Sequence, residues 1–105
     1  MLKLGEDIQG YKGCNVEWTI TRPEDVTHQG HVRISSAAPK EDDGLGYHRG
    51  VSIHFNRANG RMRIPQRVEV NWASLGGQSV ATARAYANMI LVACELAELI
   101  EAEYE

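Results

Sequence analysis

Apolar and polar residues alternate with a period of two in several stretches of the first two thirds of the chain. In Cys14–Arg22, three apolar residues (Val16, Trp18 and Ile20) share one face and polar residues share the other. This alternation, with β-branched and aromatic residues, predicts a half-buried strand. The same pattern predicts three further strands, over Gly30–Ser36, Tyr47–Asn56 and Arg61–Trp72.

The last two predicted strands form a hairpin. Asn59-Gly60 lies between them, and both residue types accept the positive φ of a type I′ turn. Pro65 interrupts the return strand, so this strand belongs at a sheet edge or carries a bulge. The inward residues expected of it are Met62, Ile64, Val68, Val70 and Trp72.

The hydrophobic period changes to that of a helix after Ser79. No glycine or proline occurs from Val80 to about Glu103, and Ser79 is a good N-cap. The helix face expected on the sheet carries Tyr86, Met89, Ile90, Ala93, Leu96, Ala97, Ile100 and Tyr104. We therefore expect one α+β domain over residues 1–105, an antiparallel sheet of about four strands packed against one long C-terminal helix.

The apolar arc of this helix is wider than one sheet face can cover. A polar stripe of Arg84, Asn88, Glu95 and Glu98 lies opposite the buried face. Three further apolar residues, Leu91, Val92 and Leu99, lie inside or beside that stripe. In one interpretation the loops and the N-terminal segment cover the flanks, and Leu91 is simply exposed. In the other, the three residues pack against a second copy or a partner protein.

Composition narrows the choice of function only slightly. The apolar fraction of 43%, with 24% charged residues, argues against a disordered chain. The net charge of -3 gives no overall attraction to nucleic acid or anionic membrane. The N-terminus lacks the apolar run of a signal peptide, and no stretch is long enough to span a bilayer. We expect no membrane association, a cytoplasmic location, and two reduced cysteines, Cys14 and Cys94.

Five arginines stand out against the acidic balance of the chain. No carboxylate lies between Gly44 and Val68, and the segment carries Arg49, Arg57, Arg61, Arg63 and Arg67. Arginine binds phosphate and carboxylate in a bidentate manner, and a two-stranded ribbon can enter the DNA major groove. The cluster therefore indicates either a partner- or phosphate-binding hairpin, or a solvated edge paired with neighbouring carboxylates.

Candidate chemistry is sparse elsewhere. The four histidines, His28, His31, His48 and His54, lack the spacing of a zinc site. No nucleophile elbow or phosphate-binding loop is present, so we expect no metal, no cofactor, no catalytic residue and no enzymatic activity.

The segment Val70-Asn71-Trp72-Ala73-Ser74-Leu75-Gly76, followed by an alanine-rich helix, resembles small accessory proteins of actinobacterial phages and mobile elements. The resemblance covers about the last third of the chain. It implies a host- or defence-directed binding protein, similar in character to anti-CRISPR inhibitors, which share no common motif that would assign a site.

Together these patterns predict a non-enzymatic module that acts by protein–protein interaction, on its own or as a homodimer through the helix. The alternative is a nucleic-acid-binding protein that uses the arginine-rich hairpin.

Overall fold

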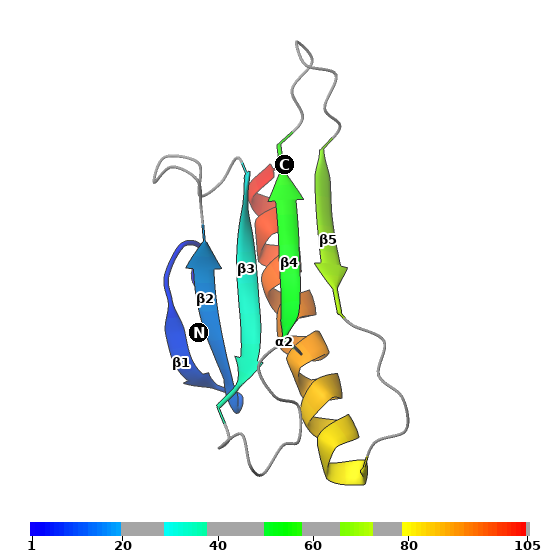
Figure 1. Ribbon diagram of the computed structural model, residues 1–105. Coiled ribbons are helices and arrows are strands. Elements are labelled where there is room, and N and C mark those ends of the chain that lie inside the picture. Colours follow the sequence, from blue (N-terminus) through cyan, green and yellow to red (C-terminus); the bar gives the residue numbers. More distant parts are fainter. Residues whose placement is uncertain (20–28, 38–49, 58–65, 73–78, 105) are drawn as a thin grey trace.

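The chain forms an antiparallel sheet with one long helix across one of its faces (Figure 1). The computed structural model describes residues 1–19, 29–37, 50–57, 66–72 and 79–104. The strands lie in the sheet in chain order, β1-β2-β3-β4-β5. Their bounds are Ile8–Tyr11, Cys14–Thr19, Gln29–Ser36, Val51–Asn56 and Arg67–Asn71, and helix α2 spans Val80–Tyr104. The α+β class and the C-terminal helix are confirmed, whereas the sheet has five strands rather than about four.

The extra strand, β1, pairs with β2 through a tight hairpin. Tyr11 is opposite Cys14, so the loop consists of Lys12 and Gly13 alone. Both loop residues have positive φ, 48° and 80°, as a type I′ turn requires. The alternation in β1 is short, and the register shifts between Ile8 and Tyr11, which explains why the sequence pattern did not reveal this strand.

The central strands pair in a register that places their apolar residues in aligned rows. Val16 is opposite Ile34, which is in turn opposite Val51, and Val32 is opposite Ile53 on the next row. All five side chains are buried. Cross-strand neighbours of this kind form a continuous apolar surface on one face of the sheet.

The edge strand β5 follows the predicted alternation only in part. Val68 and Val70 are partly buried against the core. Trp72 was expected to point inward, but it lies just beyond the end of β5 and is 55% exposed. The predicted turn at Asn59-Gly60 and the inward residues Met62 and Ile64 lie outside the described residues.

Helix α2 begins where the sequence predicts. The Ser79 hydroxyl accepts a hydrogen bond from the Thr82 backbone N–H at 3.2 Å, and the Ser79 carbonyl accepts one from the Ala83 N–H. Ser79 is therefore the N-cap. The face on the sheet buries Tyr86, Met89, Val92, Ala93, Leu96, Ala97 and Ile100.

Val92 corrects the sequence interpretation. It was assigned to a partner-binding flank with Leu91 and Leu99, but its side chain is 1% exposed and belongs to the core. Helix α2 packs against β2 to β5 (Figure 1), and the flank of the helix that carries Val92 is part of this contact.

The N-cap gives a direct test of the helix start. Ser79→Ala should lower the free energy of unfolding by about 1 kcal/mol, because the Thr82 N–H loses its acceptor. Ser79→Asp keeps an acceptor and should retain most of that stability. Urea unfolding would measure both, and an equal loss in the two variants would contradict the capping role.

Candidate functional site

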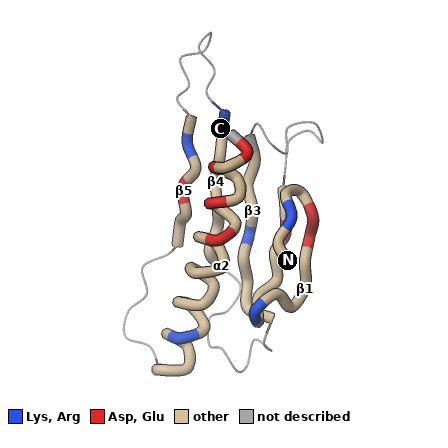
Figure 2. The backbone as a smooth tube through the Cα atoms, turned by 180° about the vertical axis from the view of Figure 1, so that it is seen from behind, with Lys and Arg blue, Asp and Glu red and all other residues tan. Residues whose placement is uncertain are grey.

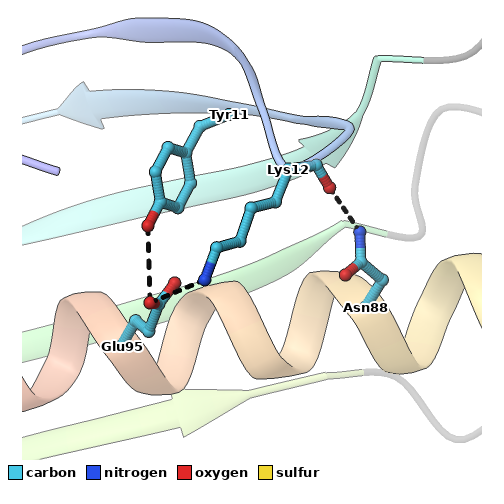
Figure 3. Close-up of polar contacts among 4 residues, drawn as sticks. All are labelled: Tyr11, Lys12, Asn88 and Glu95. Atoms are coloured by element: carbon cyan, nitrogen blue, oxygen red, sulfur yellow. Dashed lines mark hydrogen bonds and ion pairs between the residues drawn. The ribbon is translucent and has the colours of Figure 1, made fainter. Parts of the chain in front are cut away.

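The polar stripe of α2 is divided between two different environments. Asn88 and Glu95 contact the turn between β1 and β2 (Figure 3). Arg84 and Glu98 are exposed. The first pair therefore connects the helix to this turn. Only the second pair remains on the outside of the helix with Leu91.

Lys12 and Tyr11 reach Glu95 from the tip of the hairpin. The Lys12 ammonium lies 2.9 Å from Glu95 Oε1, and the Tyr11 hydroxyl donates to the same oxygen at 3.4 Å. The hydrogen bond between the two charged groups raises the pKa of Lys12 and lowers the pKa of Glu95. Because both groups are solvent-exposed, this ion pair contributes little stability and mainly orients the turn.

Asn88 makes the second attachment. Its amide nitrogen donates to the Lys12 carbonyl oxygen at 2.7 Å and lies 3.5 Å from Cys14 Sγ. Asn88 and Lys12 are 76 positions apart in the sequence. The sequence signal for this turn is the dipeptide Lys12-Gly13, which is a weaker turn signal than Asn-Gly.

Five residues form what we call the outer seam of α2: Val80, Arg84, Leu91, Glu98 and Ala102. They share the side of the helix that faces away from the sheet, since they recur at helical spacing and all are exposed. Leu91 is 67% exposed. Viewed from behind, α2 lies in front of the sheet, and no other described element covers it (Figure 2).

The other predicted partner-binding residue of the helix lies apart from this seam. Leu99 is 40% exposed, and the 100° step per residue places it about 80° around the helix from Leu91. The three residues grouped by sequence therefore occupy three environments, with Leu91 outside, Leu99 on a flank and Val92 in the core.

The arginine cluster is described only in part. Arg57 and Arg67 are both exposed, and they lie at the same end of the β4–β5 pair because Asn56 is opposite Arg67. Arg67 also approaches Glu69, with 3.7 Å between Nε and Oε2. Arg49, Arg61 and Arg63 lie outside the described residues.

The sheet face opposite α2 carries a pair of histidines. His31 on β3 and His54 on β4 are directly opposite, with ring centroids 4.5 Å apart. The pKa of His31 is lowered, mainly by partial burial and then by the nearby His54 and Arg33. Within the described part of the chain, no three histidine, cysteine or carboxylate side chains come close enough to hold a metal ion.

No known protein family, curated protein or solved structure matches this chain. In the described residues, no helix is both long and apolar enough to cross a membrane.

The two cysteines are free thiols in different surroundings. Cys14 is 1% exposed, whereas Cys94 on α2 is partly exposed. Burial raises the pKa of the Cys14 thiol because the thiolate would lose its hydration.

This burial predicts a loss of stability at high pH. The folded chain holds the Cys14 proton more tightly than the unfolded chain does. The stabilising effect is complete below the ordinary thiol pKa and is lost as pH rises through the raised value. Urea unfolding across this range should therefore show a steeper decline for the natural chain than for Cys14→Ala. Parallel curves for the two proteins would contradict the prediction.

Proposed function

We propose that this chain is a non-enzymatic binding module that acts by protein–protein interaction through the outer seam of α2. The observation that supports it is Leu91, a large apolar side chain that is 67% exposed near the middle of a helix whose opposite side is buried on the sheet. Arg84 and Glu98 flank it on the same side, so the seam combines an apolar centre with charges of both signs. This is the arrangement of a small interface with a polar rim.

The hairpin contacts support this choice of surface. Asn88 and Glu95 would otherwise extend the polar character of the helix surface, but they are bound to the β1–β2 turn. The same contacts hold the hairpin and the helix in a defined relation. A surface built on a rigid helix binds with a smaller loss of conformational entropy than a flexible segment does.

The resemblance to accessory proteins of phages and mobile elements suggests the setting. In this proposal the module works in the cytoplasm as an inhibitor that covers part of a target protein. It requires neither a cofactor nor a metal.

The test is capture of a target from a lysate of the native host on the immobilised chain. A target of this surface should bind the natural protein and Leu99→Asp, but not Leu91→Asp. Both variants place the same charge on α2, and only Leu91 belongs to the seam. Equal capture by the two variants would contradict a role of the outer seam.

Nucleic-acid binding through the arginine-rich hairpin is the second candidate. The exposure of Arg57 and Arg67 at one end of the β4–β5 pair favours it. A gel-shift titration at low and moderate salt would test it, because phosphate contacts weaken steeply with salt. A shift that disappears in Arg57→Glu would support this function, and no shift even at low salt would reject it.

A further inference from the structure

The charges along α2 oppose the dipole of the helix. The first turn carries no acidic residue and the last turn carries no basic one. Arg84 lies near the N-terminus, whereas Glu98, Glu101 and Glu103 lie toward the C-terminus (Figure 2). Acidic groups near a C-terminus and basic groups near an N-terminus are unfavourable in an isolated helix. The dipole effect is confined to the terminal turns, so in a single copy it disfavours Glu101 and Glu103, which lie in the last turn.

The same charges become complementary when a second helix runs in the opposite direction. Arg84 is seven positions before Leu91, and Glu98 is seven positions after it. A two-fold axis through Leu91 would therefore place Arg84 of each copy opposite Glu98 of the other. Two ion pairs would form, and each acidic C-terminal end would lie beside the positive N-terminal end of its partner.

The apolar residues of the outer seam have the same symmetry. Val80 is eleven positions before Leu91 and Ala102 is eleven positions after it, so these two residues would also meet. At the axis, Leu91 would pack against its own copy. Ala87, four positions before Leu91, is small and exposed, which permits a close approach of the two helices.

Spacings of four and seven residues keep these positions on one side of a helix. The seam thus presents one continuous face to a partner helix. An isologous contact needs a patch that is complementary to itself under a two-fold rotation, and this seam meets that condition.

We propose that the outer seam binds the outer seam of a second copy of this chain, antiparallel and with the two-fold axis at Leu91. This inference rests on the proposed function, since it names the partner of the same surface. The apolar area offered by one leucine and its small neighbours is modest. The dimer is therefore weak and forms in a concentration-dependent way.

Sedimentation equilibrium over a range of micromolar concentrations tests the proposal by charge exchange. The natural chain should pass from monomer to dimer as concentration rises. Arg84→Glu alone or Glu98→Arg alone should each weaken dimerisation by about tenfold or more, because like charges then face each other twice. The double variant restores opposite charges and should dimerise nearly as well as the natural chain.

Two controls distinguish this antiparallel register from a parallel pair and from a general effect of surface charge. Glu17→Arg reverses an exposed carboxylate on β2, on the sheet face opposite α2, and should leave the dimer unchanged. In a parallel pair Arg84 would face Arg84 of the other copy, and Glu98 would face Glu98. Combining Arg84→Glu with Glu98→Arg would then not restore dimerisation. Two results would overturn the proposal. One is a natural chain that stays monomeric at every concentration, and the other is a double variant that dimerises as weakly as the single variants.

Failure of the dimer differs from failure of the proposed function. If the natural chain stays monomeric but captures a different host protein that Leu91→Asp does not bind, the surface assignment stands and only its partner changes. If neither a dimer nor a target sensitive to Leu91→Asp is found, both proposals fall.

Discussion

Val92→Asp is expected to leave the chain largely unfolded, whereas Leu91→Asp should fold with nearly the stability of the natural protein. The two residues are neighbours in the sequence, but Val92 is 1% exposed and Leu91 is 67% exposed. A carboxylate at position 92 would have to be buried without a partner among Met89, Leu96 and the apolar sheet face. The cost is several kcal/mol, comparable with the whole stability of a small domain.

Circular dichroism and urea unfolding at submicromolar concentration would measure this difference. The low concentration matters because Leu91→Asp should also weaken dimerisation, which would lower apparent stability at higher concentrations. A cooperative transition for Val92→Asp close to that of the natural chain would contradict the packing of α2 on the sheet.

Ile53→Ala should lower the free energy of unfolding by about 2–5 kcal/mol. Ile53 lies on β4, is paired with Val32 on one side and Val70 on the other, and is fully buried. Removing three carbons there would leave a cavity between the sheet and α2, where backbone pairing on both sides limits relaxation. Urea unfolding would give this difference in free energy, provided that the slope of the unfolding free energy against urea concentration is the same in both proteins.

Ile8→Ala is the matched control. Ile8 undergoes the same change in chemistry, but it is partly exposed on the edge strand β1, where the chain can adjust. Its loss of stability should be clearly smaller. Equal losses at the two positions would show that the centre of the core does not lie between β4 and the helix.

Four of the five strands, the helix and its cap follow from local sequence patterns. Val16, Val32 and Ile34 alternate with polar residues, and each is buried on the face that the alternation predicts. Ser79 begins the helix for an equally local reason, since its hydroxyl satisfies a free N–H of the first turn. Such features depend on neighbours within a few residues, so the pattern of residue types along the chain is enough to predict them.

Other features did not follow from local patterns. β1 was not predicted because its alternation is short and its turn depends on Lys12, a residue type that seldom adopts positive φ. Trp72 continues the alternation of β5, but the strand ends at Asn71, so the period no longer determines its exposure.

The candidate site likewise has features that the sequence pattern predicts and features that it does not. The sequence placed Arg84, Asn88, Glu95 and Glu98 in one polar stripe and grouped Leu91 with Val92 and Leu99. The helical period alone gives the angular position of each residue, but it does not say how much of the helix the sheet covers or what reaches the polar side.

The sequence by itself determined the class of fold, the layer to which most residues belong, and the limits of the helix. Hydrophobic periodicity carries this information because burial acts on each residue according to its type and its place in a repeat. Only the tertiary structure decided that Asn88 and Glu95 bind the hairpin, that Val92 is buried, and that Leu91 stays outside. The hairpin contacts join residues 76 and 83 positions apart, and the different exposures of Val92 and Leu91 depend on how α2 lies on the sheet. Strand order, register and turn conformation together set this geometry.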